Sequence, residues 1–183
     1  MRTFALLLTG LSTAWIVQSA APVPRPSPEL VLQRGAGAPL RISQFRGKIV
    51  ALALGHTTCD HCQFLTTTLK KIQKDYADRN VQVVEAAFEG GVNVNYPMFL
   101  KALEPNFPTG YTNEEEVKKY LHWNDKTDGL LMIPYMIFID ARGIIRGDFN
   151  GKDGFFSDAD KRIRAELDKL VKAAAARPAV KKK

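Results

Sequence analysis

The feature that most constrains the fold is a continuous apolar run, Ile49 to Leu54, followed shortly by the only two cysteines, Cys59 and Cys62. An apolar run this short, without polar alternation, is typical of a strand buried on both faces of a sheet. After Thr58, a good N-cap, apolar side chains recur at helical spacing: Leu65, Leu69, Ile72 and Tyr76. The sequence therefore predicts a buried strand leading into a helix, with Cys59 at its first position and Cys62 one turn inward.

A second buried strand is predicted over residues 81–88 (VQVVEAAF). Strand, helix and strand together indicate a right-handed parallel crossover. Residues 89–131 are then expected to form an irregular, partly helical insertion. One short helix is predicted to open with Asn95 followed by Pro97. A second is predicted to be capped by Thr112, with a glutamate three residues later.

The chain is expected to return to the sheet at residues 135–140 and to turn back as an antiparallel strand over 143–149. Ser157 is predicted to cap a last helix. Near the start, residues 29–33 and 39–43 flank a glycine-containing turn, which predicts a small hairpin. The order of elements indicates an α/β fold, a central mixed β-sheet flanked by helices.

The two ends of the chain have their own composition. Arg2 and the apolar stretch after it predict a secretory signal peptide over residues 1–21. That stretch would span about 21 Å as a helix, against about 30 Å for a bilayer core, which argues against an uncleaved anchor. Residues 22–28, rich in proline, predict an exposed linker, residues 29–176 a single domain and residues 177–183 a basic disordered tail. We expect a periplasmic or secreted protein without a stable membrane span after cleavage.

The formal net charge of +7 raises the question of nucleic-acid binding. Arg2 and four basic residues of the tail carry most of that excess. The remaining body is close to neutral and has no basic face interleaved with aromatic residues, so no nucleic-acid partner is expected.

Three kinds of site use two cysteines in this spacing. A redox-active pair is favoured because a helix N-terminus stabilises a thiolate on Cys59. A structural disulfide would enclose only two residues and remove little entropy from the unfolded chain. A metal site would need two more ligands, for which only His56, His61 and His122 are available among the histidines. We therefore expect a redox-active disulfide, with no metal and no other cofactor.

The run GKIVALALGHTTCDHC, residues 47–62, resembles the redoxin branch of the thioredoxin superfamily, near the TlpA-like thiol–disulfide oxidoreductases. Further along, Ile133 and Pro134 before a predicted strand are similar to that family's pair of a hydrophobic residue and a cis-proline. The resemblance covers residues 29–172, with an insertion before Pro134. It implies the thioredoxin fold.

The resemblance also implies roles for particular residues. Cys59 would attack a substrate disulfide, and Cys62 would resolve the mixed disulfide. Ile133 and Pro134 would hold the substrate backbone against the sulfurs. The implied partners are protein thiols and disulfides together with a redox partner protein, and we expect a monomer.

Two departures from the family pattern affect these expectations. Thr57 and Thr58 stand where the family has an aromatic residue before the first cysteine, which leaves the substrate preference open. Ala53 stands where thioredoxins carry a buried aspartate that accepts the proton of the second thiol. Glu85 is a candidate substitute, although the expectation for this strand residue is that it faces solvent.

His61, next to the second cysteine, resembles the active site of oxidising DsbA-type proteins. A cationic imidazole there would stabilise the Cys59 thiolate and make the disulfide a stronger oxidant, and Asp60 would act in the opposite direction. His61 and Asp60 are therefore candidate redox-tuning residues. His56 and His122 are expected to be structural or exposed.

Two other functions are compatible with the same predicted fold and cysteines. A peroxiredoxin-like hydroperoxide reductase needs a threonine three residues before its reactive cysteine, and His56 occupies that position. A copper-binding module without catalysis would use Cys59, Cys62 and a histidine. The sequence favours an exported thiol–disulfide oxidoreductase of the reductase or isomerase type over both.

Overall fold

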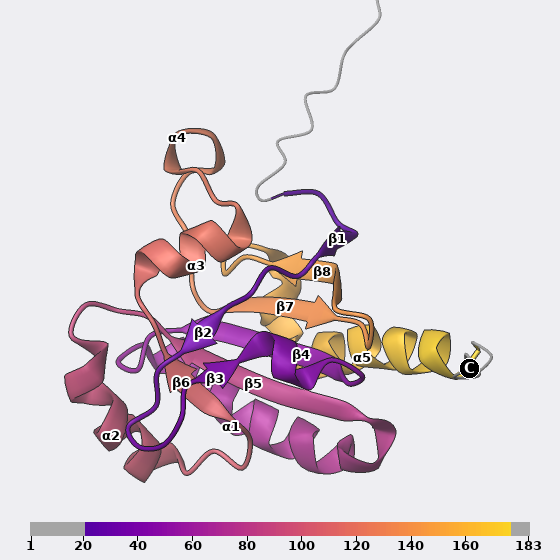
Figure 1. The fold of residues 1–183 in the computed structure, drawn as a ribbon, viewed down its shortest axis with the longest axis horizontal. Helices are drawn as coiled ribbons and strands as arrows, with labels where there is room; N and C mark the ends of the chain where they lie inside the picture. The colour runs from indigo at the N-terminus through magenta and orange to yellow at the C-terminus, as the bar shows by residue number, and fades with distance from the viewer. Residues whose placement is uncertain (1–20, 177–183) are drawn as a thin grey trace, which may run out of the picture.

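The apolar run forms β4 (Ile49–Gly55), which lies inside a six-stranded mixed sheet (Figure 1). The computed structural model describes residues 21–176, so the predicted tail and all but the last residue of the predicted signal peptide lie outside the described residues. The strand order is β1-β8-β7-β4-β5-β6. The other strands of this sheet are β1 (Arg25–Pro26), β5 (Val81–Ala87), β6 (Thr109–Tyr111), β7 (Tyr135–Ile139) and β8 (Ile144–Phe149).

The strand–helix–strand unit around the cysteines is confirmed. β4 leads into α1 (Asp60–Asp75), and α1 leads to β5, which pairs with β4 in parallel. On its other side β4 pairs with β7 in antiparallel orientation, and β7 pairs likewise with β8. This is the mixed α/β sheet expected from the sequence.

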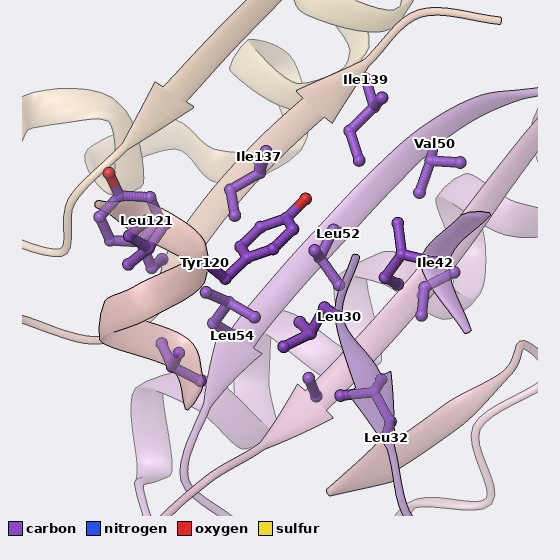
Figure 2. Packing of buried hydrophobic residues seen from close by; sticks show 14 of the residues in the cluster. Leu30, Leu32, Ile42, Val50, Leu52, Leu54, Tyr120, Leu121, Ile137 and Ile139 are labelled. Carbon is purple, nitrogen blue, oxygen red and sulfur yellow. The ribbon is translucent and has the colours of Figure 1, made fainter. Parts of the chain in front are cut away.

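Helices and the N-terminal segment cover the two faces of the sheet. α1 and α5 (Ala159–Ala175) pack on one face, where Leu69 and Ile163 are fully buried. α3 (Glu114–Leu121) and the N-terminal segment cover the other face, where Figure 2 shows Leu30, Leu52 and Tyr120 close together. Each large apolar side chain buried in this way contributes roughly 1.5–3 kcal/mol, so packing on both faces holds β4 in place.

The predicted N-terminal hairpin is present as β2 (Val31–Leu32), paired in antiparallel orientation with β3 (Leu40–Arg41). Residues 25–33, which we call the N-terminal strap, run from one edge of the sheet to the other (Figure 1). At one edge β1 pairs with β8. At the other, Gln33 and Tyr111 exchange backbone hydrogen bonds of 2.7 and 2.8 Å. The strap thus contacts both edges of the sheet.

The prediction that residues 22–28 form an exposed linker outside the domain is wrong at Arg25 and Pro26. These two residues form β1, and the buried Arg25 side chain lies 2.7 Å from a carboxylate oxygen of Asp148 in β8. Burial raises the pKa of Asp148, and Arg25 opposes that rise. Proline is tolerated at a sheet edge because one side of an edge strand makes no ladder bonds, so a proline-rich composition did not exclude a strand.

The insertion between β5 and β7 is partly helical, as expected, but its elements differ in detail. α2 (Val92–Leu103) begins before Asn95 and contains Pro97. The helix begins at Val92, earlier than predicted, and Val92, Tyr96 and Phe99 on it are buried together. A further strand that the sequence did not predict, β6, then pairs in parallel with β5.

Three helix caps lie one residue after the predicted position. Asn113, not Thr112, caps α3, and Asp158, not Ser157, caps α5; each side chain accepts a backbone N–H of the first turn. Cys59, not Thr58, caps α1. The remaining short elements are α4 (Asp125–Asp128) and the 3₁₀ segments η1 (Ile42–Phe45), η2 (Ala77–Arg79) and η3 (Gly154–Asp158).

Candidate active site

The two cysteines lie at the start of α1, where β4 ends. Cys59 has extended backbone angles and is the N-cap, so its sulfur accepts the backbone N–H of Cys62 at 3.3 Å. The prediction that Thr58 caps the helix is therefore corrected, because the cysteine sulfur itself takes the capping position. An N–H donor directed at Cys59 Sγ stabilises negative charge on that sulfur.

The environments of the two sulfurs differ. Cys59 is partly exposed, whereas Cys62 is 2% exposed, and both are free cysteines. The Cys62 thiol donates to Cys59 Sγ across 2.7 Å. Burial and this hydrogen bond raise the pKa of Cys62, and a hydrogen bond from the backbone of His56 acts against them. The geometry therefore makes Cys59 the accessible sulfur and favours a protonated thiol on Cys62.

Gly55, the last residue of β4, makes room for the buried sulfur. A Cβ atom at this position would lie 3.0 Å from Cys62 Sγ and 3.1 Å from Cys62 Cβ. Such a contact is tighter than ordinary van der Waals distance, so any larger residue would displace the sulfur. Glycine at the end of the strand lets Cys62 lie directly against β4.

The expectation that Glu85 faces solvent is wrong. Glu85 lies in β5 opposite Ala53 of β4, is 6% exposed, and accepts a hydrogen bond of 2.7 Å from Thr66 of α1. Its other carboxyl oxygen is buried without a hydrogen-bond partner among residues 21–176. Burial raises the pKa of Glu85 to about 7, and the Thr66 hydrogen bond moderates that rise. A titratable carboxyl group therefore lies behind the cysteines, on the strand next to Ala53.

Thr66 connects this carboxyl group to the cysteine helix. Its hydroxyl lies 2.7 Å from Glu85 and 3.0 Å from the carbonyl oxygen of Cys62. A hydroxyl has one proton, so Thr66 shares it between these two acceptors or donates to one of them at a time. Thr66 thereby connects the Glu85 carboxyl group to the first turn of α1.

The segment before the cysteines is held by polar contacts that sequence reasoning missed. Thr57 is buried, and both its N–H (2.9 Å) and its hydroxyl donate to one carboxylate oxygen of Glu89, just after β5. The Gln63 side chain donates to the Thr57 carbonyl at 2.6 Å. No local pattern indicates these contacts, because Glu89 comes from a different element.

Ile133 and Pro134 lie immediately before β7, and the peptide bond between them is cis, the geometry that the resemblance implies. Tyr135, the next residue, pairs with Leu54 of β4, next to the glycine that contacts Cys62. Both Ile133 and Pro134 line a cleft that His61 also lines. The structure therefore brings the Ile133–Pro134 segment before β7 close to the start of the cysteine helix.

Comparison with known proteins agrees with this arrangement. Residues 23–147 match the model of the AhpC/TSA family. The chain belongs to the AhpC/TSA family. This membership confirms the redoxin assignment within the thioredoxin superfamily.

Solved structures identify the fold of this AhpC/TSA member. A thiol:disulfide interchange protein of the thioredoxin family from Chlorobium tepidum TLS is 23% identical, with a TM-score of 0.63 over 81% of this chain and 99% of its own. The thioredoxin domain of a thiol-disulfide oxidoreductase from Bacteroides vulgatus is 14% identical, with a TM-score of 0.66 over 83% of this chain and 99% of its own. The chain therefore has the thioredoxin fold.

The remaining candidate residues of this AhpC/TSA chain are exposed or make packing contacts. Asp60 and His61 are exposed in the first turn of α1. The His56 ring packs edge-on against Phe88, with 4.7 Å between ring centroids, and His122 is exposed at the end of α3. Among residues 21–176, no three His, Cys, Asp or Glu side chains gather as metal ligands. In the same part of the chain, no helix is both long and apolar enough to cross a membrane.

Proposed function

We propose that this AhpC/TSA protein is an exported thiol–disulfide oxidoreductase that acts on protein thiols and disulfides through Cys59 and Cys62. The observation that carries the proposal is the asymmetry of the pair. A partly exposed sulfur caps a helix and accepts an N–H, while a buried thiol donates to it from 2.7 Å. That arrangement suits a nucleophile and its resolving partner.

In the reducing direction, the Cys59 thiolate attacks one sulfur of a substrate disulfide. The substrate S–S bond breaks, a mixed disulfide forms with Cys59, and the released substrate thiolate takes a proton from water. Cys62 then loses its proton and attacks Cys59 Sγ, so the second substrate sulfur leaves as a thiolate. The substrate disulfide gains two electrons, and Cys59 and Cys62 become a disulfide. Oxidation of a substrate dithiol is the reverse sequence.

Resolution requires a group that accepts the proton of Cys62. Because Ala53 replaces the aspartate of thioredoxins, we assign this role to Glu85. Its burial against α1 and a pKa of about 7 suit proton exchange near neutral pH. No other cofactor is part of the proposed reaction.

Ile133 and Pro134 are the proposed substrate-positioning residues, since they line the cleft beside the cysteine helix. The predicted signal peptide supports export. The two related structures, a thiol:disulfide interchange protein and the thioredoxin domain of a thiol-disulfide oxidoreductase, support this activity. We place it in the periplasm or outside the cell, as a monomer that exchanges electrons with a redox partner protein.

Hydroperoxide reduction is the second candidate function, because the AhpC/TSA match favours it. The position three residues before Cys59 holds His56, whose ring packs against Phe88. This position therefore carries an imidazole ring in place of the threonine hydroxyl. We therefore rank disulfide exchange first.

The test uses the reduced chain, a disulfide-bonded model protein and hydrogen peroxide as separate oxidants. We expect rapid oxidation by the protein disulfide and slow oxidation by peroxide. The Cys62→Ser variant should accumulate a mixed disulfide on Cys59, visible by intact mass, and the Cys59→Ser variant should not. Faster oxidation by peroxide, or a mixed disulfide on Cys62, would overturn the proposal.

A further inference from the structure

The loop that leads from β4 into the cysteine helix is attached to the segment after β5. We call residues 56–58 the pre-cysteine loop. Just before the loop, the Gly55 carbonyl oxygen accepts the Phe88 N–H at 3.1 Å. The His56 ring packs edge-on against the Phe88 ring. Phe88, the first residue after β5, therefore holds the start of the loop.

Glu89 holds the middle of the loop. Thr57 is 3% exposed, and its N–H and hydroxyl both donate to one carboxylate oxygen of Glu89, the N–H at 2.9 Å. Among residues 21–176 the Glu89 side chain makes no other hydrogen bond, and its second oxygen is buried without a partner. The Glu89 carbonyl oxygen accepts the Val92 N–H at 3.1 Å, so the start of α2 fixes the backbone that carries this carboxyl group. Within the described residues, the carboxyl group of Glu89 thus serves Thr57 alone.

The backbone of the loop contacts the first turn of α1. The His56 carbonyl oxygen accepts the Cys59 N–H at 3.3 Å, and the Thr57 carbonyl oxygen accepts the Gln63 side chain at 2.6 Å. A peptide unit is planar, so the N–H of Thr57 and the carbonyl group of His56 move together. This one peptide unit joins Glu89 at its N–H to the Cys59 backbone at its carbonyl oxygen.

The chain at the start of the loop also lies against the buried sulfur. A Cβ atom at Gly55 would be 3.0 Å from Cys62 Sγ, so this backbone is in close contact with the thiol. Burial raises the pKa of the Cys62 thiol, and the His56 backbone opposes that rise. The other titratable groups that act on this thiol are Cys59 and Glu85. A shift of the loop would therefore change how readily Cys62 loses its proton.

We infer that Glu89 is a positioning residue for the resolution step: it fixes the pre-cysteine loop, so that the loop backbone stays against Cys62 when this thiol attacks Cys59. The inference rests on the proposed function, because resolution is a step of that reaction. Without the carboxyl group, Thr57 would keep two buried donors without this acceptor, and the loop would shift to find another. Attack by Cys59 depends less on the loop, because its sulfur is partly exposed and accepts the Cys62 N–H within the first turn of α1.

The test uses the reduced chain and a symmetrical aromatic disulfide that releases a coloured thiolate at each step. The Cys59 thiolate attacks the aromatic S–S bond, which forms a mixed disulfide and releases the first coloured thiolate. Cys62 then loses its proton and attacks Cys59 Sγ, so the second coloured thiolate leaves and Cys59 and Cys62 become a disulfide. Stopped-flow absorbance gives a rate constant for each release. Repeating the measurement over a series of pH values gives the pH midpoint of the second release.

Glu89→Ala should slow the second release roughly tenfold, the effect of one lost hydrogen bond to a charged group, and should move its pH midpoint upward. The first release should stay close to the wild-type rate. Glu89→Gln should restore the second release, because an amide oxygen can accept both Thr57 donors. Glutamine carries no charge and accepts no proton, so this rescue separates positioning from a direct electrostatic or proton-accepting role.

Thr57→Val removes one of the two donors and should slow the second release in the same direction, by a smaller factor. This variant also tests the inference if Glu89→Ala does not fold. Glu116→Ala is the matched control, because Glu116 is exposed and lines the same surface cleft as Glu89. Its second release should keep the wild-type rate.

Unchanged second releases in the Glu89→Ala and Thr57→Val variants would overturn the inference. Equal slowing in Glu89→Gln and Glu89→Ala would also overturn it, since the charge rather than the position of the loop would then matter, and so would equal slowing in Glu116→Ala. Failure of the wild-type chain to give both releases would instead overturn the proposed function.

Discussion

Glu85 is the proposed proton acceptor for Cys62, a buried acid whose carboxyl group makes its one side-chain hydrogen bond among residues 21–176 with Thr66. In the Glu85→Gln variant, an amide keeps the shape of the side chain but cannot accept the proton of Cys62. General-base assistance is worth roughly 10²-fold or more, so breakdown of the mixed disulfide should slow by about that factor. Quenched-flow trapping should show the intermediate accumulating, while its formation rate is unchanged. Equal resolution rates in variant and wild type would remove Glu85 from the mechanism.

The same carboxyl group predicts how stability depends on pH. Its pKa is about 7 in the folded chain against an ordinary 4.5, so the folded state binds more protons between these values. Stability should therefore fall as pH rises from about 4.5 to about 7, by on the order of 3 kcal/mol. Urea unfolding at pH 5 and pH 8 should show this decrease in the wild-type chain and a smaller one in Glu85→Gln. An equal decrease in both would contradict the assignment.

His61 and Asp60 test electrostatic tuning of the cysteine pair. If His61 stabilises the reduced form, as its position beside Cys62 predicts, the disulfide of the His61→Ala variant should become harder to reduce and its potential should fall. Asp60→Asn removes a negative neighbour, so its potential should rise. An interaction of 1.4 kcal/mol corresponds to about 30 mV for two electrons. Equilibrium titration against glutathione measures both, and an unchanged potential in the His61 variant would leave that residue without a tuning role.

At the scale of elements, the contact between the end of β4 and the first turn of α1 positions the buried sulfur. The Gly55→Ala variant places a methyl group 3.0 Å from Cys62 Sγ, so the helix start must move. Overpacking of this kind costs about 1–3 kcal/mol. We expect a lower free energy of unfolding and slower closure of the disulfide. Gly35→Ala is the control, since a Cβ there meets no atom within 4 Å.

The elements that the sequence predicted correctly are those with a strong local pattern. A continuous apolar run marks β4, and helical spacing of apolar residues marks α1. β6 has only three residues and forms because β5 offers it a parallel edge, which no local pattern indicates. Likewise, Glu85 lies among apolar residues, which do not indicate which face of the sheet its side chain occupies. Its position opposite Ala53 and its hydrogen bond with Thr66 show that it faces α1.

At the scale of the whole molecule, the N-terminal strap depends on a buried ion pair. The Arg25→Ala variant leaves Asp148 buried without its cation, which should cost roughly 3 kcal/mol of stability. The Arg25→Ala/Asp148→Ala double variant should recover much of that loss. Arg79→Ala is the control, because its pair with Asp168 is more than half exposed and should contribute less than about 1 kcal/mol. Equal losses for Arg25→Ala and Arg79→Ala in urea unfolding would contradict a structural role for the strap.

The path of the strap also limits the order in which the contacts of the fold can form during synthesis. Residues 25–33 leave the ribosome early, but their partners in β6 and β8 extend to residue 149. Contacts this distant in sequence form slowly, and they cannot form at all until most of the chain has been made. In a nascent chain, both edges of the sheet therefore stay unpaired with the strap until late in synthesis. Delayed closure of this kind would keep the polypeptide unfolded, as the proposed export through a narrow channel would require.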